Sequence, residues 1–159
     1  MSKTVWTFTN QRELDKNEFV DYFERKVFRT IRKYGMLGDK PGKVVLSKGT
    51  DLNTVVLKHV LENKFEVSFG KGNLSCDNLS AIAENVFGKV LNGDFKIRVR
   101  EDAPLMMLSD KEVELYAQLK GLSGVKRKGD AKIQDLFGKF LGKNQDLEIN
   151  VLKVAGQIA

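Results

Sequence analysis

The spacing of apolar residues divides the chain into helices and short strands. Between residues 17 and 37, apolar side chains recur every three or four positions, which is the spacing of one buried helix face. The same reasoning predicts further helices over 51–63, 76–94, 109–122, 131–143 and 147–159. Short runs rich in β-branched and aromatic residues predict strands over 4–9, 43–47, 64–70 and 95–101.

The order of these elements indicates the fold class. Strands alternate with helices through the middle of the chain, which favours an α/β fold with a mostly parallel sheet. Ser109 and Glu112 form a capping-box pattern, and Asp77 or Asn78 is placed to cap the helix that follows. We expect a single domain over 1–159. Its parts would be an N-terminal strand and basic helix (1–40), an α/β core (41–101) and C-terminal helices (102–159).

Composition excludes several classes of protein. The 159 residues are 42% hydrophobic and 30% charged, as in ordinary globular domains. No apolar run approaches the ~20 residues of a membrane span, and the first residues do not resemble a signal peptide. We therefore expect a cytoplasmic protein. Cys76 and His59 are the only cysteine and histidine, so we expect neither a disulfide framework nor a cysteine/histidine metal site.

Positive charge is concentrated toward the two ends of the chain. The net charge is +6, with eleven Lys/Arg against six Asp/Glu in residues 1–48 and seven against two in residues 120–143. This distribution favours a polyanionic partner, of which nucleic acid is the commonest. The alternative is that the cations form a solvated face that only keeps the protein soluble. The candidate RNA-binding residues are Arg25, Lys26, Arg29, Arg32 and Lys33 on the first helix and Lys126, Arg127 and Lys128 in a flexible loop.

A loop between a strand and a helix is the candidate nucleotide site. The stretch "SKGTDLN" (47–53) follows a buried strand, at the end where open α/β sheets place their ligands. Phosphate loops bind through backbone N–H groups and small residues that allow close approach. The loop has one glycine, with Lys48 where a second would be expected.

Four segments carry a resemblance to a known family. They are "FVDYFERKVFRTIRKYGML", "KVVLSKGTDLNTVVLKHVL", "CDNLSAIAENVFGKVLNGD" and "LSDKEVELYAQLKGL". In these segments the chain resembles the archaeal and eukaryotic cytosolic tRNA 2-thiolation enzymes of the TtuA type, which are PP-loop (N-type) ATP pyrophosphatases. The resemblance implies a shortened PP-loop (HUP-type) fold: a parallel sheet of about three or four strands, helices on both faces and a C-terminal helical extension. It also implies tRNA as a partner.

The chemical groups of that family are changed in this chain. Against the PP-loop pattern, Lys48 replaces a glycine, Thr50 the lysine and Leu52 the final serine. Both carboxylates of the family's second motif are lost at Ser80 and Ala81, within the stretch 77–81. The segment that holds the paired catalytic cysteines is mostly deleted. Residues 123–125 stand where a third cysteine is expected, and Asp15 and Glu18 where a zinc module has a cysteine and a histidine.

These departures lead to three hypotheses about function. The first is a non-catalytic paralogue of a tRNA-thiolation enzyme that binds RNA or a tRNA-modification partner, with no catalytic residue, no metal and no cofactor. The second is a small nucleotide-binding protein that still holds ATP or AMP through Ser47, Gly49 and Asp51. The third is a regulatory subunit of a true thiolation enzyme that does not touch RNA.

Overall fold

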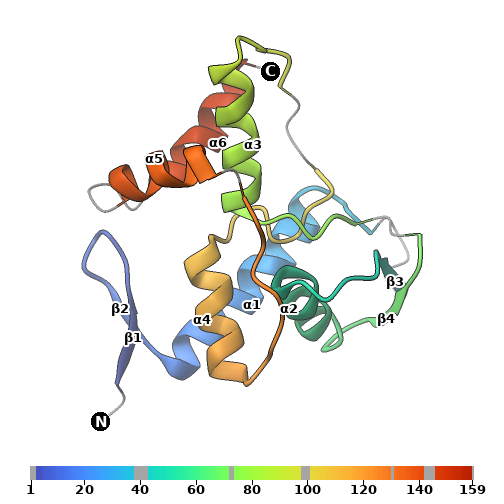
Figure 1. The fold of residues 1–159 in the computed structure, drawn as a ribbon. Coiled ribbons are helices and arrows are strands. Elements are labelled where there is room, and N and C mark those ends of the chain that lie inside the picture. The colour runs from blue at the N-terminus through green and yellow to red at the C-terminus, as the bar shows by residue number, and fades with distance from the viewer. Residues whose placement is uncertain are drawn as a thin grey trace.

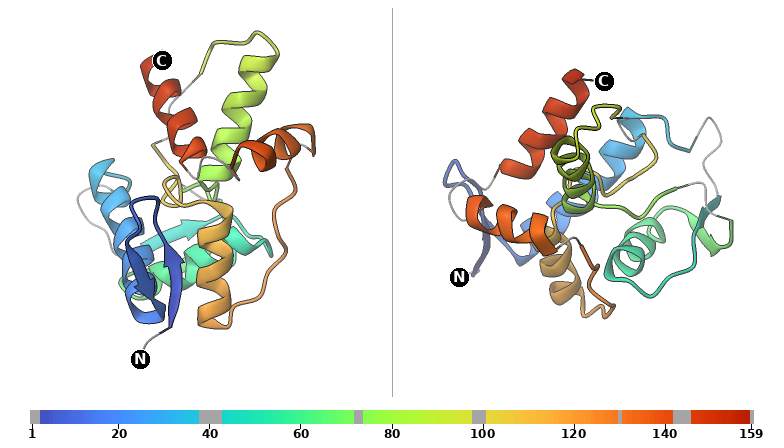
Figure 2. Two further views of the ribbon diagram at one scale, coloured as in Figure 1. Left: turned by 90° about the vertical axis from the view of Figure 1, so that its left-hand side faces the viewer. Right: turned by 45° about the horizontal axis from the view of Figure 1, so that its top comes forward.

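The computed structural model describes residues 3–37, 43–71, 74–97, 101–129, 131–141 and 146–158. Strands alternate with helices in the middle of the chain, and the α/β fold class is confirmed. One part of the molecule holds α1 (Lys16–Lys33), α2 (Leu52–Leu61), α4 (Asp110–Lys120) and the small sheet of β3 (Lys43–Leu46) and β4 (Glu66–Phe69) (Figure 1). The helices α3 (Leu79–Leu91), α5 (Ala131–Leu141) and α6 (Leu147–Ile158) gather at one end of that part (Figure 2).

The N-terminal residues form an antiparallel hairpin that leads directly into the first helix. β1 (Thr4–Thr7) pairs with β2 (Glu13–Asp15), a strand that the sequence pattern did not reveal. α1 (Lys16–Lys33) then begins with a capping box. The Asp15 carboxylate accepts from the Glu18 N–H at 2.9 Å, and the Glu18 carboxylate accepts from the Asp15 N–H at 3.1 Å. These two residues, at positions where the resemblance implies zinc ligands, therefore start a helix.

The parallel sheet is smaller than expected in the described part of the chain. β3 (Lys43–Leu46) and β4 (Glu66–Phe69) run parallel and are connected through α2 (Leu52–Leu61). One further parallel bridge joins Leu46 to Leu74. The strand expected over 95–101 is not seen at residues 95–97, and residues 98–100 lie outside those described. The described sheet therefore has two strands and a single bridge, where three or four strands were expected.

The main apolar core lies between the helices of the first part and the sheet. Phe19, Phe23, Val27 and Ile31 are buried along one face of α1, as the periodicity predicts. α1 and α2 both pack against α4 (Asp110–Lys120). The rings of Phe23 and Tyr116 stack there with centroids 4.2 Å apart. This core holds the α2 N-terminus, and with it the candidate loop, in a fixed place.

A second apolar cluster holds the C-terminal helices on α3 (Leu79–Leu91). Its members include Leu79, Ile82 and Val86 of α3 together with Leu152 of α6 (Leu147–Ile158). α5 (Ala131–Leu141) contributes Ile133, which packs against α3. Among the residues that the structure describes, no helix is both long and apolar enough to cross a membrane.

Candidate functional site

The loop after β3 is organised around the N-terminal cap of α2. Asp51 accepts a hydrogen bond from the Thr54 N–H at 3.1 Å and another from the Thr54 hydroxyl at 2.7 Å. Gly49 lies so close to this cap that an added Cβ would come 2.7 Å from Asp51 Oδ1. A side chain at position 49 would therefore have to displace the Asp51 carboxylate from the helix cap. Asp51, the expected phosphate ligand, has its carboxylate committed to the helix cap.

A second segment crosses this loop and uses one of its donors. The Leu52 N–H donates to the Val125 carbonyl at 2.7 Å, and the Val125 N–H donates to the Thr50 carbonyl at 3.0 Å. A Cβ on Gly124 would come 2.9 Å from the Leu52 Cα, so only glycine allows this approach. At the α2 N-terminus the N–H groups of Leu52 and Thr54 are thus bonded within the chain. Two donors that a phosphate cradle would offer are already taken.

The loop opens into a cavity of about 580 Å³. The structure brings Ser47 and Asp51 together there, beside Lys48 and Cys76, whereas Gly49 is not part of the lining. Burial is the main cause that raises the pKa of the Cys76 thiol. A hydrogen bond with Thr54 lowers it in part, and the charges of Asp51 and Asp77 each raise it by less. Cys76 is therefore held as a thiol, not a thiolate. In the described ranges no three His, Cys, Asp or Glu side chains converge as metal ligands would.

The expected basic residues of α1 are mostly exposed. Arg29 and Arg32 lie in solvent, and neither has an ion-pair partner within the described part of the chain. Arg25 pairs with Asp21 at 3.0 Å in an exposed bridge. Lys26 differs from the rest because it is half-buried and donates to the Tyr22 hydroxyl at 3.0 Å. Lys33 is exposed and lies 5.4 Å from the Tyr34 ring centroid.

The loop cluster expected from Lys126, Arg127 and Lys128 does not exist as three free cations. Lys126 is exposed and lies 3.6 Å from Glu114, and Lys128 is exposed beside the loop cavity. Arg127 is 16% exposed and turns inward. Arg127 is therefore not part of a flexible, exposed cluster, because its charge is used inside the protein.

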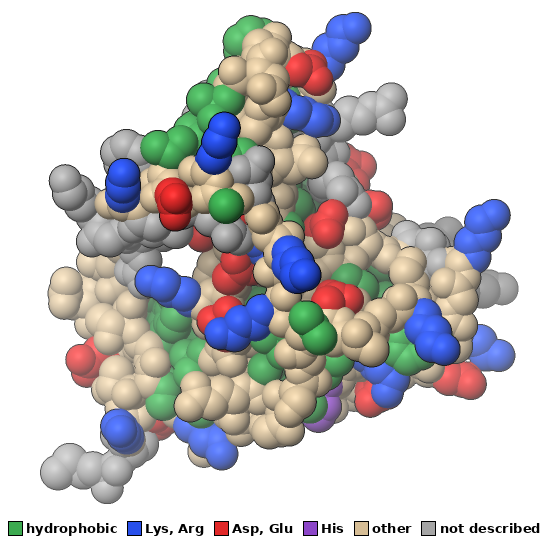
Figure 3. Space-filling model, viewed as in Figure 1, with side chains coloured by type: hydrophobic (Ala, Val, Ile, Leu, Met, Phe, Trp, Pro, Cys, Tyr) green, Lys and Arg blue, Asp and Glu red, His purple; other side chains and the backbone are tan. Residues whose placement is uncertain are grey.

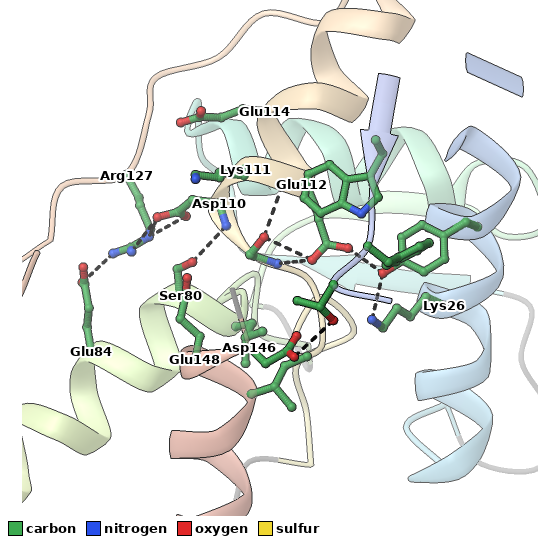
Figure 4. A pocket seen from close by; sticks show the side chains of 17 residues that line it. Lys26, Ser80, Glu84, Asp110, Lys111, Glu112, Glu114, Arg127, Asp146 and Glu148 are labelled. Carbon is green, nitrogen blue, oxygen red and sulfur yellow. Dashed lines mark hydrogen bonds and ion pairs between the residues drawn. The ribbon is translucent and has the colours of Figure 1, made fainter. Parts of the chain in front are cut away.

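Arg127 joins two acidic side chains that sequence reasoning missed. It donates to Glu84 at 2.7 Å and, through two nitrogens, to Asp110 at 2.7 and 2.8 Å (Figure 4). Burial alone would lower the pKa of Arg127, but the hydrogen bonds and charges of Glu84 and Asp110 raise it above its ordinary value. Asn78 also donates to Asp110, at 2.8 Å. The one sign of this network in the sequence is Glu84, a charged residue among the apolar residues of α3.

Among the comparisons with known proteins, the one with solved structures finds a similar fold. No family profile and no curated protein matches the sequence. Among solved structures, the chain is similar to the U34-tRNA thiolase NcsA from Methanococcus maripaludis, solved with its [4Fe-4S] cluster. The TM-score is 0.74 at 12% sequence identity, over 98% of this chain and 84% of the other. Nearly the whole of this α/β chain therefore has the fold of a U34-tRNA thiolase.

Proposed function

We propose that this chain is a non-catalytic, tRNA-binding relative of the tRNA thiolases, which works without a metal or a bound cofactor. The observation that supports it most is the fold: 98% of the chain superimposes on a protein named as acting on tRNA, with a TM-score of 0.74. A fold can be kept while its chemistry is lost, because function depends on the site. The proposal therefore rests next on what this chain presents at its surface and its loop.

The surface offers cations for phosphate groups. Arg25, Arg29 and Arg32 are exposed on α1, and only Arg25 has an ion-pair partner among the described residues. An exposed bridge such as Arg25–Asp21 contributes little and can be exchanged for a phosphate contact. Arginine on phosphate gives affinity without reading base sequence. We expect α1 to contact the tRNA backbone and Lys33 and Lys128 to add weaker contacts.

The loop supports a role without catalysis. The Leu52 and Thr54 N–H groups are bonded to Val125 and Asp51. A pyrophosphate cradle needs such donors unpaired and pointing outward. The 123–125 segment, at the position of the family's third cysteine, instead covers the helix N-terminus. In this chain the N-terminus of α2 thus contacts the 123–125 segment, in place of a substrate phosphate, and this contact stabilises the fold.

The test is tRNA binding by the unaltered protein and by a triple variant, Arg25→Glu, Arg29→Glu and Arg32→Glu, at several salt concentrations. A control triple, Lys64→Glu, Lys71→Glu and Lys96→Glu, changes the net charge equally at exposed positions outside α1. We expect the α1 triple to lose binding and the control to keep most of it. Equal binding by both triples would remove α1 from the account. No binding by the unaltered protein at low salt would favour a regulatory subunit that does not touch RNA.

A nucleotide-binding role is the second candidate, and the loop cavity favours it. Its volume of about 580 Å³ lies within the range of small-molecule sites. Ser47 and Lys48 line it and could approach a phosphate. Asp51, Asp77 and Asp102 also line it and balance the three cations of the lining, so the cavity offers a nucleotide no net positive charge. We therefore place this function second.

A further inference from the structure

A separate cavity of about 380 Å³ lies away from the phosphate loop. Its walls are the β1–β2 hairpin, α1 and the N-terminal turns of α3, α4 and α6 (Figure 4). In the space-filling view, acidic side chains lie next to Lys and Arg side chains around the hollow between the C-terminal helices and the rest of the molecule (Figure 3). Neither the resemblance nor the proposed RNA surface assigns a use to this cavity.

The lining of this cavity, which we call the acidic cavity, is negative although the protein is positive. Three cations line it: Lys26, Lys111 and Arg127. Six acidic side chains line it: Glu84, Asp110, Glu112, Glu114, Asp146 and Glu148. The formal difference is three negative charges, in a chain whose net charge is +6. Such a cavity attracts cations and repels anions.

Most of these acids already have partners. Glu84 and Asp110 are bonded to Arg127. Glu112 accepts from the Tyr22 hydroxyl at 2.6 Å and completes the capping box with Ser109. Acids in a first helical turn also offset the positive end of the helix dipole. These interactions within the protein therefore explain most of the acidic cluster. They do not explain one of its residues, Glu148.

Glu148 is the residue that this explanation leaves over. It is 7% exposed, it points from α6 toward Ser80 (Figure 4), and its Oε2 atom has no hydrogen-bond partner among the described residues. Burial raises the pKa of the Glu148 carboxyl, and hydrogen bonding to Ser80 offsets part of that effect. A buried polar atom without a partner is strongly disfavoured unless something fills the position. A positively charged ligand group that donates hydrogen bonds would give this carboxylate both a hydrogen-bond donor and an opposite charge.

Part of the cavity lining is aromatic. Trp6, Phe8 and Tyr22 line it, with Phe8 and Tyr22 in an edge-to-face contact at 5.2 Å. Two cations already lie near these rings: Lys26 is 5.1 Å from the Tyr22 centroid and Arg12 is 5.9 Å from that of Phe8. Aromatic rings attract cations through their faces and pack against apolar groups. A buried carboxylate and aromatic rings in the lining of one cavity are a combination that suits an organic amine.

We propose that the acidic cavity binds an organic ammonium ion, with the ammonium group beside the Glu148 carboxylate and the apolar part against Trp6, Phe8 and Tyr22. The volume suits a small molecule. An anion is disfavoured because acidic side chains already occupy the first turns of α4 and α6, where a helix N-terminus would otherwise hold it. This inference does not rest on the proposed function, since the α1 arginines and the phosphate loop do not line the cavity.

The experiment uses three probes of matched shape: phenethylamine, its neutral analogue 2-phenylethanol and the anion phenylacetate. Trp6 is the only tryptophan in the chain and lines the cavity, so its fluorescence reports binding directly. We expect a saturable change with phenethylamine and about tenfold or greater weakening with the alcohol, because an interaction with a charged group is lost. Glu148→Gln should weaken amine binding similarly. Glu66→Gln, which removes an exposed acid on β4, should leave it unchanged.

Several results would overturn the proposal. They are no saturable change with phenethylamine, equal affinity for the amine and the alcohol, stronger binding of phenylacetate, or unchanged amine binding by Glu148→Gln. If circular dichroism shows that Glu148→Gln does not fold, the unaltered protein still decides. Nuclear Overhauser effects should then connect bound phenethylamine to the rings of Trp6 and Phe8. Saturable binding without such contacts would place the amine elsewhere and reject this cavity.

Discussion

Arg127 and Asp110 form a two-point ion pair, with Nη2 2.7 Å from Oδ2 and Nε 2.8 Å from Oδ1. The same guanidinium reaches Glu84 on α3 at 2.7 Å. One arginine in the segment after α4 thus joins the N-terminal turn of α4 to α3. It also holds the 123–127 segment in place, where Val125 bonds to the loop before α2.

We predict that Arg127→Met destabilises the protein by about 2–3 kcal/mol. The change leaves Glu84, whose side chain is 8% exposed, without its cation, and breaking a buried pair from one side is strongly unfavourable. Lys126→Met is the control, since the exposed Lys126–Glu114 pair contributes at most about 1 kcal/mol. Urea unfolding measures both. Similar losses of unfolding free energy in the two variants would show that the Arg127 network stabilises the protein no more than an exposed ion pair does.

Gly124→Ala should destabilise the protein by about 1–3 kcal/mol, as overpacking against backbone does. The added Cβ would come 2.9 Å from the Leu52 Cα, and neither side is a flexible side chain that can move aside. Gly70→Ala is the matched control, because its Cβ would meet only a Val45 methyl at 3.5 Å. Thermal unfolding compares the two, and the exchange of the Leu52 amide should speed up in Gly124→Ala alone. An equal exchange rate in both variants would contradict the contact.

Glu148→Gln is expected to stabilise the protein near neutral pH and to do so less as the pH falls. Burial raises the pKa of Glu148 in the folded state, and Asp110 and Glu84 add to this while Arg127 opposes it. Below the ordinary carboxyl pKa of about 4.3, the group is protonated in both states and has no penalty. As the pH rises through the higher folded-state pKa, the buried group must ionise and stability is lost. Unfolding free energies of both proteins from pH 4 to 8 test this; a constant difference would contradict it.

The affinity for tRNA should fall steeply with salt if α1 contacts phosphates. Each contact on a single strand or duplex adds about −0.7 to −0.9 to the slope of log affinity against log salt. Replacing Arg25, Arg29 and Arg32 should make that slope shallower by roughly 2–3. Affinity should differ little between tRNAs of different sequence. A slope unchanged by the triple variant would show that these arginines make no phosphate contact.

Mg²⁺–ATP should leave the melting temperature of the protein almost unchanged, because Leu52 and Thr54 no longer offer their N–H groups. Asp51→Ala should cost about 1 kcal/mol without any nucleotide, since it removes the α2 cap. Asp51→Asn keeps a capping side chain and is the control for that effect. A rise of several degrees with ATP, lost in Asp51→Asn, would instead favour the nucleotide-binding role.

Local features of this protein were predictable from the sequence. The helix over 109–122 begins at Ser109 and ends at Gly121 as expected, because its capping box joins residues only three apart and Gly121 adopts a positive φ of 68°. Asn78 caps α3 for the same kind of reason. The buried face of α1 follows from the helical period alone. Interactions within one turn depend little on the rest of the chain.

The use of the charged residues was decided only by the tertiary structure. Arg127 looks like its basic neighbours in the sequence, yet its partners Asp110 and Glu84 lie 17 and 43 residues away. Glu148 gives no sign in the sequence that burial leaves one of its oxygens without a partner. Val125 covers the loop before α2 through backbone bonds, which no side-chain pattern encodes. Periodicity assigns residues to faces of helices, but the return path of the chain determines which faces and which charges meet.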